Sequence, residues 1–187
     1  GLLQALGAAA RREGCALYAL TDDEMRQAAA RVVARGIRRQ CADPRVRAEV
    51  QGCLRPDRDP RRDGIPDAAQ GEWDRRSYLE PDPKAVEARG RRMAAEAPAL
   101  IVLTTRADEP LAWLQAGQAL ARVLLLAAAR GLAASYLNSA VEVAETRAQL
   151  ERLLDDGRPQ ILFRLGYPTL PAADTPRRPA QEVLTLG

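Results

Sequence analysis

The 187-residue chain contains no histidine. This absence excludes Ser-His-Asp and Cys-His catalysis, a histidine general base, and most zinc or non-haem iron sites. Its three cysteines, Cys15, Cys41 and Cys53, form no Cys-x-x-Cys pair, and an odd number fits a reducing compartment better than a disulfide framework. The sequence therefore offers no self-contained metal or nucleophilic site, and we expect partly buried thiols in helices or a strand.

Phosphate-binding loops are also missing. Neither Gly-x-Gly-x-x-Gly nor Gly-Lys-Ser/Thr occurs, which argues against Rossmann and P-loop nucleotide sites. Lys84 is the only lysine, and the 28 basic residues are interspersed with 25 acidic ones, which leaves a net charge of +3. A nucleic-acid-binding face usually concentrates basic charge with little acid, so we expect no nucleic-acid partner.

Membrane and export signals are absent from the sequence pattern as well. No apolar run approaches the length of a membrane span, and the first residues do not read as a signal peptide. A chain of this length can bury about 70% of its unfolded surface in a single core. We therefore predict one domain over residues 1–187, soluble and cytoplasmic, with no membrane partner.

The clearest structural pattern lies in the second half of the chain. Residues 99–103 form a continuous apolar run, as expected of a strand buried on both faces. Apolar residues then recur at helical spacing, which predicts a long helix from a cap at Asp108 to Arg130. Gly131 can adopt the left-handed conformation that ends this helix, and residues 160–167 return as another strand. Because helices and strands alternate along the chain, the predicted class is α/β or α+β.

Residues 55–83 lack this periodicity. Proline, glycine, aspartate and arginine dominate the segment, and a few aromatic and apolar residues stand alone in it. An irregular loop of this length inside a compact domain is usually functional or disordered. Two interpretations stay open: a lid or arm over a ligand site, or a solvated connector.

Four short motifs carry a resemblance to a known family. They are Trp113-Leu-x-Ala-Gly117, Arg130-Gly-Leu-Ala-Ala-Ser-Tyr-Leu-Asn138, Leu165-Gly-Tyr167 and Thr175-Pro-Arg-Arg-Pro179. The run that contains them resembles the C-terminal half of nitroreductase-like flavoproteins, most closely their Acg-type branch. The resemblance implies a three-layer nitroreductase-type sandwich. The family's N-terminal phosphate motif does not occur here, so we expect an incomplete N-terminal edge, and either a homodimer or a pseudo-dimer with a missing N-terminal half.

The resemblance also implies an FMN site. In this family a basic residue near the C-terminus contacts the FMN phosphate, and the stretch after the central helix passes beside the isoalloxazine ring. Carried onto this sequence, the phosphate falls to Arg177 and Arg178, whose guanidinium groups suit phosphate oxygens. The ring falls to Gly131, Leu132, Ser135 and Asn138. From the residues alone, a helix stop followed by a core strand and a solvated arginine pair in a tail are equally good accounts.

The implied function is that of an FMN-binding, NAD(P)H-dependent nitroreductase-like oxidoreductase. A nicotinamide reduces the flavin, which then reduces a nitro compound or a quinone in a ping-pong mechanism. Because the flavin carries the difficult chemistry, we assign no catalytic side chain and no metal ligand. Two alternatives stay open: a non-catalytic protein that stores or sequesters FMN, as proposed for the Acg-type branch, and a ligand-free structural half of a larger flavoprotein.

Overall fold

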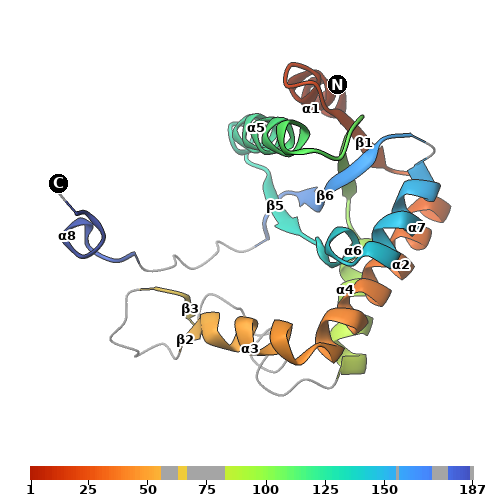
Figure 1. Ribbon diagram of the computed structural model, residues 1–187. Helices are drawn as coiled ribbons and strands as arrows, with labels where there is room; N and C mark the ends of the chain where they lie inside the picture. Colours follow the sequence, from red (N-terminus) through yellow and green to blue (C-terminus); the bar gives the residue numbers. More distant parts are fainter. Residues whose placement is uncertain (56–62, 67–82, 155, 170–176, 186–187) are drawn as a thin grey trace.

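A four-stranded antiparallel sheet organises the chain (Figure 1). The computed structural model describes residues 1–55, 63–66, 83–154, 156–169 and 177–185. In spatial order the strands are β1 (Ala16–Leu20), β4 (Ala99–Thr105), β6 (Arg158–Gly166) and β5 (Ala133–Tyr136). The central residues of β4, from Leu100 to Leu103, are fully buried, which confirms the predicted strand covered on both faces.

Helices cover both faces of this sheet. The helices of the described residues are α1 (Leu2–Arg11), α2 (Asp23–Ala42), α3 (Pro44–Cys53), α4 (Pro83–Ala95), α5 (Pro110–Ala128), α6 (Ser139–Glu142), α7 (Ala144–Leu154) and α8 (Ala180–Val183). α2, α4, α6 and α7 cover one face, and α1 and α5 cover the other. Successive side chains of a strand point to opposite faces. Leu100 and Val102 accordingly pack in one core with α2, α4, α6 and α7, whereas Ile101 and Leu103 pack in the other with α1 and α5. The predicted three-layer sandwich is confirmed.

The long central helix begins and ends for reasons visible in the sequence. Pro110 occupies its first turn, where no backbone amide is needed, and Glu109 is the N-cap. The prediction that Asp108 caps this helix is therefore wrong, because the proline fixes the start one residue later. At the other end Gly131 adopts a φ of 73°, and Leu132 N–H donates to the Ala127 carbonyl at 3.0 Å. The predicted glycine stop is confirmed.

Residues 133–136, directly after that stop, form β5, an edge strand that pairs with β6 alone within the described sheet. β5 is partly exposed, so it is not the core strand that the residues alone allowed. The contact of this stretch with a flavin ring stays a prediction. A one-turn helix, α6, then follows directly, and the sequence pattern did not indicate it.

α5 has one buried and one exposed apolar face. Ala116, Ala119 and Val123 pack on the sheet, whereas Leu114 and Leu125 are 69% and 73% exposed. By length and composition alone α5 is apolar enough to cross a membrane, which corrects the expectation that no segment reaches such a length. One helix of this kind is weak evidence for a membrane, since core helices of soluble proteins pass the same test.

Two short strands pair at the start of the irregular segment. β2 (Leu54–Arg55) and β3 (Ile65–Pro66) lie parallel, and Arg55 Nε donates to Asp63 Oδ1 at 3.1 Å. Residues 56–62 and 67–82, which make up most of the predicted lid or arm, lie outside the described residues. The lid or arm therefore stays a prediction.

Candidate ligand-binding site

A cavity of about 300 Å³ lies between the helices on one face of the sheet. Its walls come from the second half of α2, from α3 and α4, and from the segment that joins β5 to α6. Most of the wall is apolar: Ile37, Val46, Val50, Val86, Met93 and Leu137. The polar lining consists mainly of Gln40, Cys41, Arg47, Arg89, Asn138 and Glu142. An apolar hollow with a few polar groups is the usual form of a small-molecule site.

Two glycines inside helices bring these walls together. A Cβ on Gly36 would lie 2.2 Å from the Ser139 carbonyl oxygen, so α2 and α6 can touch only where this side chain is absent. A Cβ on Gly90 would lie 2.0 Å from Ile37 Cδ1, which gives the same close approach between α4 and α2. Glycine inside a helix costs about 1 kcal/mol relative to alanine. At Gly36 and Gly90 the close packing of α2 against α6 and α4 offsets this cost.

Asn138 is held at the edge of the cavity by the sheet. Its side-chain oxygen accepts a hydrogen bond from Leu162 N–H of β6 at 3.0 Å, and its own carbonyl accepts from Val141 N–H at 2.7 Å. On the next residue, the Ser139 carbonyl accepts from Thr146 Oγ1 of α7 at 3.4 Å. Because the oxygen of the Asn138 amide is engaged by β6, its NH₂ group is left as a fixed donor beside the cavity.

Among the described residues of the cavity lining, Glu142 is the one carboxylate. It accepts a hydrogen bond from Gln40 Nε2 at 2.5 Å, and this neutral donor leaves its negative charge in place. Burial raises the pKa of the Cys41 thiol, and the nearby Arg47 guanidinium opposes this only in part. The thiol is therefore protonated near neutral pH and behaves as a small apolar wall residue.

The structure brings only part of the sequence-predicted site to this cavity. Asn138 lines it, together with its neighbours Tyr136 and Leu137. Ser135 lies half-buried in β5, Gly131 is exposed at the end of α5, and Leu132 packs against the core on the opposite face. None of these three is a lining residue.

The two C-terminal arginines lie elsewhere. Arg177 and Arg178 are exposed, precede α8, and do not line the cavity. The ribbon shows α8 apart from the sheet and its helical layers (Figure 1). The single chain therefore does not bring this pair to the cavity at Asn138.

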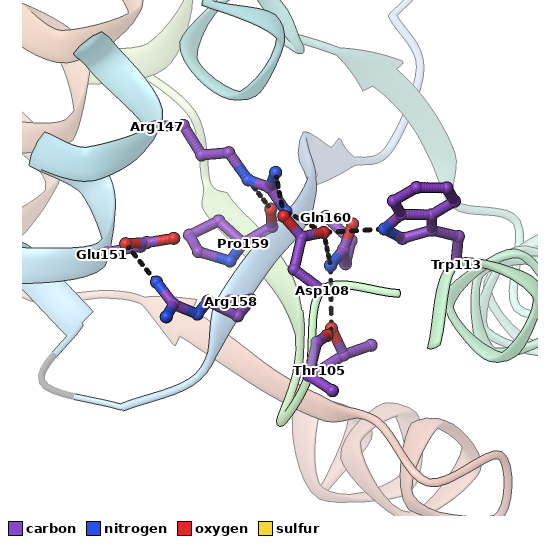
Figure 2. A network of polar contacts seen from close by, with 9 residues as sticks. Thr105, Asp108, Trp113, Arg147, Glu151, Arg158, Pro159 and Gln160 are labelled. Carbon is purple, nitrogen blue, oxygen red and sulfur yellow. Dashed lines mark hydrogen bonds and ion pairs between the residues drawn. The ribbon is translucent and has the colours of Figure 1, made fainter. Parts of the chain in front are cut away.

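A second polar cluster joins the start of α5 to α7 and β6 (Figure 2). Arg147 donates to both carboxylate oxygens of Asp108, at 2.8 and 2.9 Å, and the Trp113 indole donates to the same carboxylate at 2.7 Å. Gln160 Nε2 bridges Asp108 and Thr105, and Arg147 Nε donates to the Pro159 carbonyl at 2.9 Å. These bonds hold the pKa of the Asp108 carboxyl well below its usual range, chiefly through Arg147.

The cavity and the Asp108 cluster lie within the part of the chain that is similar to a known family. The model of the Nitroreductase family matches residues 8–167, which include the sheet, its covering helices and the cavity. The chain belongs to the nitroreductase family.

Two curated relatives in this family come from Mycobacterium tuberculosis and carry the provisional name NAD(P)H nitroreductase, MT3217 in strain CDC 1551 and Rv3131 in strain H37Rv. Each is 38% identical to this chain over 96 residues, which is 49% of this chain. The match spans only 28% of the length of either relative. Assignment to the Acg-type branch stays a prediction.

Solved nitroreductase structures share the fold across the whole chain. The FMN- and NADPH-dependent nitroreductase NfnB from Sphigopyxis sp. strain HMH gives a TM-score of 0.59 at 20% identity, with 100% of this chain and 88% of that chain covered. The FMN-dependent NfnB from Mycobacterium smegmatis, solved with NADPH, gives 0.58 at 14% identity, with 100% and 87% covered. A Bacteroides fragilis nitroreductase with bound FMN gives 0.56 at 14%, with 100% and 86% covered.

Sequence reasoning missed several residues that build the nitroreductase-fold cavity. Gly36 and Gly90 could have been found from the sequence, because a glycine in the middle of a predicted helix indicates close packing at that position. Arg47 and Arg89 carried none, since 28 basic residues are spread along the chain. Which arginines face a hollow depends on how α3 and α4 pack against α2.

Proposed function

We propose that this chain is an FMN-binding, NAD(P)H-dependent oxidoreductase that reduces nitro compounds or quinones, and that the cavity at Asn138 receives the flavin ring. The observation that carries the proposal is the cavity itself. It combines apolar walls with a fixed amide donor, in a chain of the nitroreductase family. Three solved neighbours are described as FMN enzymes or contain FMN, and this supports the same cofactor here.

The residues of the cavity suit a flat, mostly apolar ring with polar edges. Ile37, Val86 and Met93 supply the apolar contact, and the hollow of about 300 Å³ is at the lower end of small-molecule sites, sufficient for a ring rather than a whole dinucleotide. The Asn138 NH₂ group is the donor for a ring oxygen or nitrogen. Ser135, on the adjacent strand, is proposed to contribute a second polar contact.

The other predicted residues have supporting roles in this proposal. Gly131 and Leu132 end α5 and set the entry of β5, and so fix where Asn138 lies. Arg177 and Arg178 would reach a flavin only through a different arrangement of the C-terminal segment or from a second copy. Gly131 with Leu132, and Arg177 with Arg178, stay candidate cofactor contacts.

A bound FMN supplies the hydride-accepting and electron-donating chemistry of the reaction. The protein's part is to bind, orient and exclude water. The apolar walls keep water from the ring face, and the neutral Cys41 thiol places no negative charge against it. The Asn138 donor favours electron density at the ring edge it faces. Among the described residues of the lining, Cys41, Tyr136 and Glu142 are able to transfer a proton, and the proposed mechanism assigns none of them as an obligatory acid or base.

The decisive experiment is a visible spectrum of the purified chain after addition of FMN and gel filtration, followed by NADPH oxidation with a nitroaromatic or quinone acceptor. We expect retained flavin absorbance, acceptor-dependent turnover, and parallel double-reciprocal plots as for a ping-pong order. Retained flavin without turnover would instead establish the storage alternative. A chain that releases all FMN would favour the ligand-free structural half.

We propose further that α5 supplies the contact with a second copy or with a homologous half. Leu111, Leu114 and Leu125 lie on one exposed face of this helix, at helical spacing. Exposed apolar patches of this kind mark interaction surfaces. Sedimentation velocity is expected to show dimers of the unaltered chain and monomers of Leu114→Glu. Gln51→Glu, which adds the same charge on exposed α3, is the control and should stay dimeric.

A further inference from the structure

Within the part of the chain that the structure describes, two serine or threonine hydroxyls are buried without a hydrogen bond to the protein. They belong to Thr104, which is 2% exposed, and Ser139, which is 8% exposed. The other buried hydroxyls, Thr105 Oγ1 and Thr146 Oγ1, each donate to a backbone carbonyl. Ser139 lines the cavity, whereas Thr104 does not. A buried hydroxyl that the protein leaves without a partner calls for an explanation, and at Ser139 a molecule bound in the cavity supplies one.

The proposed reaction takes up one proton for each quinone that is reduced. NAD(P)H supplies two electrons and one hydrogen, and the hydroquinone that forms carries two hydrogens, so the second comes from water as a proton. The apolar walls of the cavity, at Ile37, Val86 and Met93, keep water from the ring that we place there. The proton therefore needs a path through side chains that both release and accept one.

Ser139 and Glu142 are the lining residues that suit this transfer. They are three residues apart on α6, and residues at this spacing lie on the same face of a helix with their Cβ atoms about 5–6 Å apart. Glu142 is exposed, and its Oε2 accepts a hydrogen bond from Gln40, which leaves Oε1 without a partner among the described residues. The pair thus extends from solvent at Glu142 to the buried hydroxyl of Ser139.

The other polar groups of the described lining suit the transfer less well. The side-chain amides of Gln40 and Asn138 do not exchange a proton as a hydroxyl or a carboxyl does. Burial raises the pKa of the Cys41 thiol, which therefore holds its proton. The ring of Tyr136 lies 6.4 Å from that of Phe163, centroid to centroid, and Phe163 packs in the core on the opposite face of the sheet.

We propose that Glu142 and Ser139 form a proton relay between water and the interior of the cavity. This inference rests on the proposed function and adds a step that the proposed function does not assign. Glu142, protonated from water at the mouth, gives its proton to Ser139 Oγ, while the Ser139 O–H bond breaks and its proton passes to the bound molecule. That proton ends on a hydroquinone oxygen, both side chains return to their starting states, and no electron moves in the relay. The relay speeds turnover without being obligatory for it.

The test measures quinone reduction at saturating FMN and NADPH in Ser139→Ala and in Glu142→Gln. We expect turnover to fall about tenfold or more in Ser139→Ala, and several-fold in Glu142→Gln, which still accepts the hydrogen bond from Gln40 but has no carboxyl group. Formate, a small carboxylic acid, should restore much of the lost turnover in Glu142→Gln. It should not do so in Ser139→Ala, where the inner member of the relay is missing.

Urea denaturation of the free chain separates a relay from a structural role. Because Ser139 Oγ has no hydrogen bond to the described protein, Ser139→Ala is expected to leave the unfolding midpoint unchanged or to raise it. Thr104→Val is the matched control, since it removes the other buried hydroxyl without a partner, at a position outside the cavity lining. Its stability should respond in the same way, and its turnover should stay within about twofold.

The other outcomes contradict the relay at different levels. An unaltered chain that retains no FMN, or retains it without turnover, overturns the proposed function and the relay with it. Unchanged turnover of Ser139→Ala at saturating FMN overturns the relay alone, even where FMN affinity falls, because the hydroxyl is then a binding contact only. A lowered unfolding midpoint together with lost turnover makes Ser139 structural. If Ser139→Ala does not fold, the exposed Glu142→Gln carries the test, and a loss that formate does not restore overturns the relay.

Discussion

The cluster around Asp108 and the cavity at Asn138 differ in how many of their hydrogen-bonding groups have partners within the protein. At the start of α5, both carboxylate oxygens of Asp108 accept hydrogen bonds, and Arg147 donates from all three of its nitrogens (Figure 2). At the cavity, Asn138 uses its oxygen and leaves its nitrogen for a ligand, beside apolar walls and Arg47. In the first cluster, protein partners engage both carboxylate oxygens and every guanidinium nitrogen. In the second, the Asn138 NH₂ group is the donor that the proposed flavin would meet.

The comparison shows why a perturbed pKa is a poor guide to the site in this fold. Among the described carboxyl groups, Asp108 has the pKa that is lowered most. That shift is explained by protein partners alone, as happens in structural ion-pair networks. The cavity has one modest shift, at Cys41, with burial as its main cause. Here unfilled hydrogen-bonding capacity, rather than a shifted pKa, distinguishes the proposed binding site from a structural ion-pair cluster.

The largest effect is expected from Gly36→Ala. The added Cβ would lie 2.2 Å from a backbone oxygen, which cannot swing away as a side chain can, so α2 and α6 must separate. Overpacking of this kind costs roughly 3 kcal/mol, and the helical preference for alanine offsets about 1, which leaves a loss of about 2 kcal/mol. Urea denaturation measures it, and flavin affinity should fall with it because Ser139 adjoins Asn138.

Gly52→Ala is the control for that substitution. Nothing lies within 4 Å of a Cβ at Gly52, which is also helical, so stability is expected to stay level or rise by up to about 1 kcal/mol. Equal and small effects at both positions would mean that α2 does not need the close approach to α6. The wall of the cavity formed by α2 and α6 would then be wrongly placed.

Much of the fold could be predicted from the sequence because its signals are local. The apolar run of β4 and the left-handed glycine after α5 each follow from backbone and side-chain preferences of a few residues. The cap of α5 was predicted one residue too early, because Pro110 occupies the first turn and makes Glu109 the N-cap. α6 was missed entirely, since a single helical turn has no periodicity. It packs against Gly36 and is joined to β6 through Leu162, both from distant segments, and Thr146 of the next helix bonds to its first residue.

The candidate site was less predictable because it is assembled from remote helices. Asn138 was predicted as a flavin contact from the resemblance to nitroreductase-like flavoproteins, and in the structure it lines the cavity. The walls contributed by α2, α3 and α4 could not be predicted, because nothing in the sequence gives the angles at which these helices meet. Exposed arginines such as Arg47 look alike until a neighbouring hollow distinguishes them.

The next largest effect is expected from substitutions of Asn138, which separate its role as hydrogen-bond acceptor for β6 from its proposed role as donor to the flavin. In Asn138→Asp the side chain still accepts the bond from Leu162 N–H but no longer donates, whereas Asn138→Ala loses both. We expect FMN affinity to fall about tenfold in either variant, and stability to fall by about 1 kcal/mol in Asn138→Ala alone. Equilibrium titration with FMN and thermal melts give the two quantities. Unchanged FMN affinity in Asn138→Asp would remove the amide from the site.

The smallest effect is expected from Asp108→Asn, which tests the cluster of hydrogen bonds around Asp108. Because the pKa of Asp108 is lowered on folding, its ionised form stabilises the protein fully above the ordinary aspartate pKa of about 3.9, and this contribution is lost as pH falls below that value. Asp108 is 37% exposed, so solvent screening limits the expected loss at pH 7 to about 1 kcal/mol.

Urea melts from pH 7 to pH 3 should therefore show the unaltered chain and Asp108→Asn converging as the pH falls below about 4. Asp23→Asn breaks a more exposed ion pair, with Asp23 77% exposed, and is expected to matter less. FMN affinity should stay within about twofold in both variants, since neither residue lines the cavity. A stable Asp108→Asn protein that fails to hold FMN would place this junction in the site and reverse the comparison between the two clusters.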